Sequence, residues 1–237
     1  MSAPAGSTPS VSSGFSSAAN PGSIETIRAA TLAEIARHRM SAILRTHDRD
    51  RALGAMEAAV TGGFRIIEFT LTTPGALELV SMFSRREGLT VGAGTVLEPA
   101  QAREAVAAGA RFLVSPVVDP EIIGLARSLG AVCIPGTYTP TEMLAAHRAG
   151  AEILKIFPAP ADLPAFVTQV RGPFPQFKLF PTAGVTADNF EAVLKAGAFG
   201  VGFVASLFAP SDIAAGNYAA IEARARMIQE RMKAAAG

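Results

Sequence analysis

The sequence predicts one α/β domain, a single (β/α)8 TIM barrel that follows an N-terminal helix and a disordered N-terminal tail. Three observations carry this prediction. Short β-like runs alternate with helical stretches along the chain, these runs are apolar almost throughout, and no GxGxxG motif follows the first of them. Strands of that composition are typical of a parallel sheet covered by helices, and eight repeats favour a closed barrel over an open doubly wound sheet.

The first segment of the chain differs from the rest in composition. Residues 1–24 contain no charged side chain and consist mainly of Ser, Ala, Gly and Pro, which cannot bury enough apolar surface to offset the entropy lost on ordering. They lack the basic start and the apolar core of a secretory signal. We therefore predict a flexible tail over residues 1–22 and the barrel domain over residues 23–237.

The elements of the barrel follow in order. Ser23 is suited to cap a helix that runs to His38, because apolar residues recur there at spacings of three and four. The predicted strands are Ser41–Arg45, Arg65–Thr70, Thr90–Thr95, Arg111–Ser115, Ala131–Pro135, Glu152–Phe157, Phe177–Pro181 and Gly200–Val204. The predicted helices between them are Arg49–Thr61, Ala76–Arg86, Pro99–Ala108, Pro120–Leu129, Thr139–Ala149, Leu163–Val170 and Thr186–Ala196.

The amino-acid composition argues against several classes of function. The chain has 21 basic and 20 acidic residues, so no global field attracts nucleic acid or an anionic membrane. No uncharged apolar run approaches the roughly 18 residues that span a bilayer. Cys133 is the only cysteine, and none of the three histidines has metal-ligand spacing. We expect no disulfide, no metal and no other cofactor, and a location in the reducing cytoplasm. Acid–base chemistry then falls to carboxylates or lysine.

Two charged residues interrupt predicted strands. Glu68 lies within the apolar run RIIEFT, and Lys155 lies within EILKIF. Burial lowers the pKa of a lysine, and a neutral amine attacks a carbonyl to form a Schiff base while a neighbouring carboxylate moves protons. The structural alternative for Lys155 is an ion pair with Glu68. For Glu68 it is an ion pair with an arginine such as Arg45 or Arg65.

Seven motifs resemble, in the same order, those of the 2-keto-3-deoxy-6-phosphogluconate (KDPG) aldolase / 4-hydroxy-2-oxoglutarate aldolase family. They are IIEFTLTTPG, VGAGTV, FLVSP, IPGTYTPTE, EILKIFPA, GPFPQFK and FPTAGV, and the resemblance covers residues 24–218. It implies a class I pyruvate aldolase of carbohydrate metabolism, a carbon-carbon lyase that forms a Schiff base and needs no metal. Such an enzyme cleaves a 4-hydroxy-2-oxo acid, for example KDPG or 4-hydroxy-2-oxoglutarate, to pyruvate and an aldehyde. The resemblance also implies a homotrimer.

The resemblance implies roles for individual residues. Lys155 corresponds to the Schiff-base nucleophile of the family and Glu68 to its general acid–base. Arg45, which closes the first predicted strand, corresponds to a residue that binds an anionic part of the substrate. The other implied substrate-binding residues are Thr72, Thr73, Thr95, Pro116, Phe157, Thr182 and Gly184.

Two turns depart from the family's pattern. Where the family commonly has PTGG, this chain has Ala183 in place of the first glycine, and where the family commonly has GxGS, it has Gly202-Phe203-Val204-Ala205. Glycine-rich turns let backbone amides approach a phosphate closely. We therefore expect Phe203 and Val204 to make the pocket smaller and more apolar, although Ser206 offers a hydroxyl group one residue later. A short or unphosphorylated substrate should be cleaved at least as well as KDPG.

Two other classes of protein stay open. One is a phosphate-binding barrel isomerase or synthase, which predicts glycine-rich turns at Gly184 and Gly202 and has no need of a lysine in the sixth strand. The other is a non-catalytic binding barrel that kept the fold and lost the activity. Only an aldolase forms a pyruvate adduct that borohydride reduces, so trapping of that adduct separates the three classes.

Overall fold

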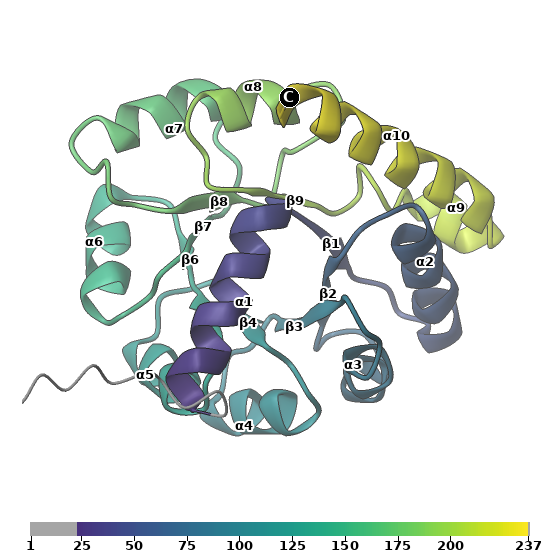
Figure 1. Cartoon of the computed structure of the whole chain (residues 1–237), viewed down its shortest axis with the longest axis horizontal. Coiled ribbons are helices and arrows are strands. Elements are labelled where there is room, and N and C mark those ends of the chain that lie inside the picture. Colours follow the sequence, from purple (N-terminus) through teal and green to yellow (C-terminus); the bar gives the residue numbers. More distant parts are fainter. Residues whose placement is uncertain (1–22, 237) are drawn as a thin grey trace, which may run out of the picture.

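The computed structural model describes residues 23–236, which form a barrel of parallel strands surrounded by helices (Figure 1). Six strands pair in the order β5-β4-β3-β2-β1-β9, and three more pair in the order β6-β7-β8. The strands are β1 (Met40–Leu44), β2 (Ile66–Thr70), β3 (Thr90–Gly94), β4 (Phe112–Val114), β5 (Val132–Ile134), β6 (Gly136–Thr137), β7 (Leu154–Ile156), β8 (Leu179–Pro181) and β9 (Val201–Phe203). Neighbouring strands pair in parallel, as predicted.

The fifth strand of the barrel is split at Pro135. β5 pairs with β4 and β6 pairs with β7, so these two short strands join the two sheets. Proline has no amide proton to donate to a ladder, while its carbonyl accepts from the Lys155 amide at 3.0 Å. Between β8 and β9, the Phe199 amide donates to the Leu179 carbonyl at 2.8 Å. The eight predicted strands therefore close into a barrel, which confirms the predicted fold class.

The helices lie around the strands (Figure 1). They are α1 (Ile24–His38), α2 (Arg49–Thr61), α3 (Ala76–Ser84), α4 (Pro99–Ala107), α5 (Pro120–Ser128), α6 (Pro140–Arg148), α7 (Leu163–Arg171), α8 (Phe190–Lys195), α9 (Pro210–Ala215) and α10 (Tyr218–Ala236). α8 begins at Phe190 rather than at the predicted Thr186, because the preceding residues form a turn in which the Thr186 amide donates to Asn189 Oδ1 at 2.9 Å. α9 and α10 add to the predicted helices.

α1 fills the end of the barrel at which the strands begin. It crosses the strands in Figure 1, and its Ile35 packs inside the barrel with Ile66 and Phe112. The Ser23 side chain accepts from the Thr26 amide at 3.2 Å, which confirms the predicted cap. Two adjoining cavities of about 660 and 420 Å³ lie at the opposite end, where the strands finish.

Strand side chains alternate between two apolar cores. The larger core lies between the strands and the helices, and the smaller one fills the barrel interior. The interior core consists of Ile35, Ile66, Phe112, Val114, Val132, Ile134, Ile153 and Phe180. Because successive side chains of a strand point to opposite faces, these residues show which other strand positions face inward.

Two features are absent from the part of the chain that the structure describes. No helix within residues 23–236 combines the length and the apolar character that crossing a membrane requires. No group of three or more His, Cys, Asp or Glu side chains in the same range is placed to hold a metal ion. The tail predicted over residues 1–22 lies outside the described residues.

Candidate active site

Glu68 faces the barrel interior. In β2, Ile66 belongs to the interior core, whereas Ile67 and Phe69 pack against the helices. Because strand side chains alternate, Glu68 points the same way as Ile66, and its exposed fraction is only 3%. The sequence alone leaves both directions open for this carboxyl group, and the pairing of β2 in the closed barrel decides between them.

Lys155 faces the same interior from β7. Ile153 belongs to the interior core, and Leu154 and Ile156 pack against the helices, so alternation turns Lys155 inward. Its ammonium nitrogen Nζ lies 4.9 Å from the centre of the Phe157 ring. The lysine is half-buried, with its reactive end close to an aromatic side chain.

Glu68 and Lys155 line one cavity of about 420 Å³ at the ends of the strands. The other predicted site residues that line it are Arg45, Thr95, Phe157, Thr182 and Gly184. Its remaining lining residues are Ile43, Thr70, Ala183, Val185, Thr186, Val204, Ala205 and Ser206. Seven of the ten predicted site residues thus come together, although they are spread over five strands and the loops after them.

Three predicted site residues, Thr72, Thr73 and Pro116, do not line this cavity. The hydroxyl oxygen of Thr70 lies 3.0 Å from that of Thr72 and 3.3 Å from that of Thr73. These contacts close the turn after β2 upon itself. Pro116 backs onto the fifth strand, where a β-carbon at Gly136 would lie 2.3 Å from the Pro116 carbonyl oxygen. The structure therefore places these three residues in the walls around the site.

Burial pushes both Glu68 and Lys155 towards their neutral forms. Desolvation raises the pKa of Glu68 to about 7, although the positive charges of Lys155 and Arg45 act to lower it. Desolvation also lowers the pKa of Lys155, which the charge of Glu68 opposes and that of Arg45 assists. The cavity thus holds a carboxyl group that exchanges a proton near neutral pH beside an amine that releases its proton more readily than a free lysine.

The structural ion pairs that the sequence leaves open are absent from the described residues. Glu68 has no ion pair or hydrogen bond to another side chain within residues 23–236. Arg65 donates to two backbone carbonyls at 3.0 and 2.9 Å, and Arg45 donates to Thr95 Oγ1 at 3.2 Å. A buried carboxyl group with no side-chain partner is costly for stability and is available for chemistry.

Thr95 holds an unusual backbone conformation at the cavity. Its φ of 61° lies in the left-handed region, which β-branched residues rarely adopt. The hydrogen bond from Arg45 to the Thr95 hydroxyl oxygen holds the guanidinium group at the cavity. Backbone strain of this kind persists only where the surrounding structure enforces it, and it clusters at functional sites.

Gly94 makes room for the carboxyl group of Glu68, a role that the sequence prediction missed. A β-carbon at Gly94 would lie 1.9 Å from Glu68 Oε1, so any larger residue there would force the carboxyl group out of its present position. Gly94 belongs to the motif VGAGTV, and in the parallel pairing of β2 with β3 it lies opposite Thr70. A glycine on the strand that pairs with the strand of a buried carboxylate indicates such a space-making residue.

Comparison with known proteins identifies the family. The family model for KDPG and KHG aldolases matches residues 32–224. The chain belongs to this family. A probable 2-dehydro-3-deoxy-6-phosphogalactonate aldolase of Rhizobium meliloti is 37% identical to it over 172 residues, which cover 71% of this chain and 81% of the relative. A 2-dehydro-3-deoxy-phosphogluconate aldolase of Pseudomonas aeruginosa is 36% identical over 156 residues, covering 63% and 69%.

A solved structure of the KDPG aldolase family agrees with this result. The crystal structure of KDPG aldolase from Legionella pneumophila, with pyruvate captured as a covalent carbinolamine intermediate, has a TM-score of 0.72 and 27% identity to this chain. The match covers 84% of this chain and 97% of that one. The predicted family, and with it the predicted class of enzyme, an aldolase, are confirmed.

One predicted departure from the KDPG aldolase family's pattern needs correction. Val204 lines the cavity as expected, but Phe203 does not. Phe203 packs between the barrel and the helices, with its ring centre 5.9 Å from that of Phe64 and 5.7 Å from that of Phe190. The expectation that Phe203 narrows the pocket is wrong, because alternation along β9 turns this side chain outward.

Ser206 lines the cavity, but its hydroxyl group is engaged. It donates to the Val185 carbonyl at 2.7 Å. The bond ties the turn after β9 to the turn after β8. A hydroxyl group has a single proton to donate, so this one is not free for a phosphate unless the bond to Val185 breaks.

Proposed function

We propose that Lys155 is the Schiff-base nucleophile of this class I aldolase and that Glu68 is its general acid–base. The observation that carries the proposal is the placement of these two groups in one cavity, with burial pushing both towards neutrality. A neutral amine is a nucleophile, and a carboxyl group with a pKa of about 7 is suited both to take and to return a proton.

The reaction begins at the C2 ketone of a 4-hydroxy-2-oxo acid. Lys155 Nζ attacks C2, the resulting carbinolamine loses water, and a protonated imine forms. Glu68, directly or through water, then removes the proton of the C4 hydroxyl group while the C3–C4 bond breaks and its electron pair moves towards the imine nitrogen. An aldehyde leaves, and the remaining enamine takes a proton at C3 and is hydrolysed to pyruvate and free Lys155. The protonated imine is the electron sink for the cleavage of the C3–C4 bond.

The substrate is held by the side chains around this pair. Arg45 lies at the cavity with its guanidinium group oriented by Thr95, and it is suited to bind an anionic group of the substrate. Phe157 and Thr182 line the cavity beside Lys155. In this proposal Thr72, Thr73 and Pro116 act indirectly. They shape the turns next to the cavity.

The assembly proposed for the protein is a homotrimer. Four large apolar side chains are exposed in the loops after successive strands: Leu97, Val117, Tyr138 and Phe157 have exposed fractions of 45%, 50%, 40% and 41%. A group of apolar side chains at a surface supports association with another subunit. Light scattering coupled to size exclusion measures the mass, and a monomer at micromolar concentration would contradict the proposal.

A cytoplasmic location is also part of the proposal. Cys133, the only cysteine of the sequence, is buried and free, which suits a reducing compartment. The partners proposed are a small 2-oxo acid and pyruvate, with no nucleic acid and no membrane.

Borohydride trapping tests the proposed chemistry. The protein is incubated with pyruvate and sodium borohydride, digested, and mapped by mass spectrometry. We expect the reduced pyruvyl group on Lys155. Lys178→Met is the matched control, because Lys178 lies against the Phe199 ring at the start of β8, away from the cavity. An adduct on another lysine would contradict the role of Lys155, and the absence of any adduct would favour an isomerase, a synthase or a non-catalytic barrel.

A further inference from the structure

A second and larger cavity adjoins the catalytic cavity. Its volume is about 660 Å³, compared with about 420 Å³ for the catalytic one. Four residues line both cavities: Ile43, Arg45, Val204 and Ala205. The two spaces therefore adjoin each other at the ends of β1 and β9, and the outer one lies next to the cavity in which a substrate is anchored at Lys155. We call the larger one the outer cavity.

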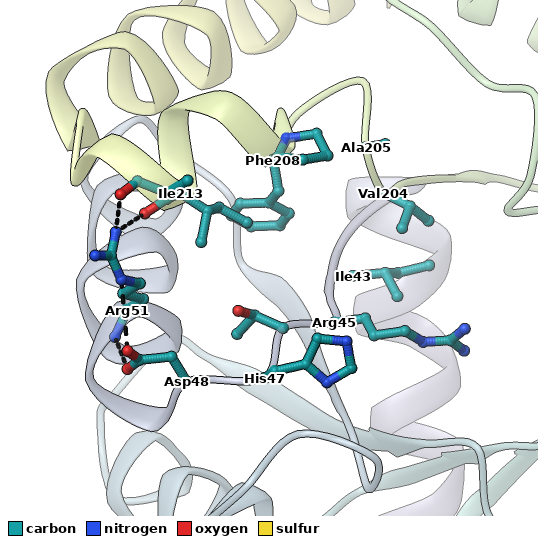
Figure 2. Close-up of a pocket in the computed structure, with 12 residues that line it drawn as sticks. Ile43, Arg45, His47, Asp48, Arg51, Val204, Ala205, Phe208 and Ile213 are labelled. Atoms are coloured by element: carbon teal, nitrogen blue, oxygen red, sulfur yellow. Dashed lines mark hydrogen bonds and ion pairs between the residues drawn. The ribbon is translucent and has the colours of Figure 1, made fainter.

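The floor of the outer cavity is apolar. Phe208 and Ile213 are buried, with exposed fractions of 3% and 8%, and their side chains meet those of Ile43 and Val204 around the same space (Figure 2). Ile43 belongs to β1, Val204 and Phe208 to the turn after β9, and Ile213 to α9. Contact with such a floor favours carbon-rich groups, because they leave water without losing hydrogen bonds.

Arg51 and Asp48, two of the three charged residues that line the outer cavity, are engaged in its wall, and the third, Arg45, donates to Thr95. Arg51 donates to the Ile213 carbonyl at 2.6 Å and to the Ala214 carbonyl, and its Nε lies 3.4 Å from Asp48 Oδ2 (Figure 2). These contacts bind the start of α2 to the end of α9. The Arg51 guanidinium group thus builds the wall, with its Nε and one of its two terminal nitrogens occupied by these contacts.

His47 lies exposed on the rim of the outer cavity, and its ring is directed towards the space in Figure 2. It has no hydrogen bond or ion pair to another residue within the described range 23–236. An imidazole in this position can donate or accept one hydrogen bond. The cavity therefore combines an apolar floor with an imidazole at its mouth that has no partner in the described residues.

We propose that the outer cavity binds the far end of the aldehyde half of the substrate, and that this end is an uncharged, carbon-rich chain. The inference rests on the proposed Schiff-base chemistry, which anchors the oxo-acid half at Lys155. The shared lining of the two cavities places the outer one beside the bound substrate, and the side chains of Phe208 and Ile213 supply the contact surface. His47 accepts or donates a hydrogen bond where the chain carries a hydroxyl group.

Aldol addition in the synthetic direction tests this proposal. Pyruvate is held constant, and kcat/KM is measured for three acceptors: propanal, hexanal and glyceraldehyde 3-phosphate. We expect kcat/KM to rise at least tenfold from propanal to hexanal, because each added methylene group gains apolar contact. We also expect hexanal to match or exceed the phosphorylated acceptor.

Two variants locate the effect in the outer cavity. Ile213→Phe fills part of the floor of the outer cavity, and Ile213→Val is its conservative control. His47→Trp narrows the mouth of the cavity at an exposed position. We expect Ile213→Phe and His47→Trp to reduce the hexanal-to-propanal ratio to below threefold while the propanal rate stays within twofold of the parent. Ile213→Val should keep the parent ratio. Circular dichroism and thermal melting establish that each variant is folded.

The outcomes separate this proposal from the Schiff-base chemistry. If pyruvate is not trapped on the parent protein, the proposed function fails and the cavity proposal fails with it. If pyruvate is trapped but the parent hexanal-to-propanal ratio is below threefold, only the cavity proposal fails. It also fails if the ratio is unchanged in His47→Trp and in a folded Ile213→Phe, or if glyceraldehyde 3-phosphate is preferred over hexanal by a hundredfold or more.

Discussion

The carboxyl group of Glu68 lies directly against the α-carbon of Gly94, so closely that a β-carbon on Gly94 would be 1.9 Å from Glu68 Oε1. The two residues are on neighbouring parallel strands, β2 and β3, which are held in register by their ladder. Gly94 touches no reacting atom in the proposed mechanism. It acts through Glu68 and is a positioning residue.

Replacing Gly94 by alanine should therefore displace the proposed acid–base. We expect Gly94→Ala to slow turnover by about 100-fold or more, comparable with the loss of a positioned acid–base group, and to destabilise the protein by about 1 to 3 kcal/mol through overpacking. Steady-state kinetics and urea unfolding measure the two effects. Gly124→Ala is the control, because a β-carbon there meets nothing within 4 Å. Near-parent turnover in Gly94→Ala would show that Glu68 does not need its present position.

Glu68→Gln should slow turnover by about 100- to 10,000-fold and still permit slow imine formation, because it keeps the shape and removes the exchangeable proton. In the parent protein the pKa of about 7 makes the carboxylate the minor form at lower pH, so kcat should rise as pH increases through about 7. This limb of the pH profile should disappear in Glu68→Gln. A loss of activity below about tenfold would assign Glu68 a structural role.

The same pKa predicts how stability depends on pH. Glu68 titrates at about 7 in the folded protein and at its ordinary value of 4.5 when unfolded, so between these values the folded state binds more protons. The contribution of Glu68 to the free energy of unfolding should therefore fall as pH rises from about 4.5 to 7. The difference in that free energy between Glu68→Gln and the parent, measured by urea unfolding across this range, isolates the contribution. A difference that does not vary with pH would contradict the raised pKa.

Lys155→Met should abolish aldol cleavage while leaving the fold intact. A neutral chain of similar length replaces an ammonium group whose burial is unfavourable, so we expect the free energy of unfolding at neutral pH to be unchanged or raised. Urea unfolding of Lys155→Met beside the parent measures it. A loss of about 3 to 5 kcal/mol, the range seen when a buried ion pair is broken, would favour a structural Lys155–Glu68 pair.

Whether the substrate carries a phosphate group is tested by comparing kcat/KM for two substrates. The turns with Ala183, Val204 and Ala205 offer a phosphate fewer close backbone approaches than glycine would, and each charge-assisted hydrogen bond is worth about 1.5 to 3 kcal/mol. We expect kcat/KM for 4-hydroxy-2-oxoglutarate to be at least as large as for KDPG. A hundredfold preference for KDPG would show that the turns bind phosphate despite their side chains.

Deleting residues 1–22 should leave the melting temperature and kcat nearly unchanged. The segment has no charged side chain and few bulky ones, and the first helix has its cap at Ser23. Differential scanning calorimetry of the shortened chain, which begins at Ser23, measures the change. A drop in melting temperature of more than about 4 °C, on the order of 1 kcal/mol for a domain of this size, would mean that the segment packs against the barrel.

The order of strands and helices follows from the sequence by itself. Apolar runs, helix caps such as Ser23 and the alternation of the two element types are local signals, and they also explain why Lys155 and Glu68 are conspicuous as charges within apolar strands. The seven motifs pointed to the family that the comparison confirmed. The interruption of the fifth strand at Pro135 is local as well, but its consequence, a change of partner from β4 to β7, depends on both neighbours.

Only the tertiary structure decided what surrounds those charges. Whether Glu68 points into the barrel or towards a helix depends on the pairing of β2 with its neighbours, and the fit against Gly94 depends on the register of β3. The turn after β2 draws Thr72 and Thr73 towards Thr70, through contacts that no periodicity reveals. The outer cavity is lined by residues of α2 and α9, two helices far apart in the sequence that Arg51 binds together. Such long-range packing is set by the closed barrel as a whole, since each contact joins residues far apart in the sequence.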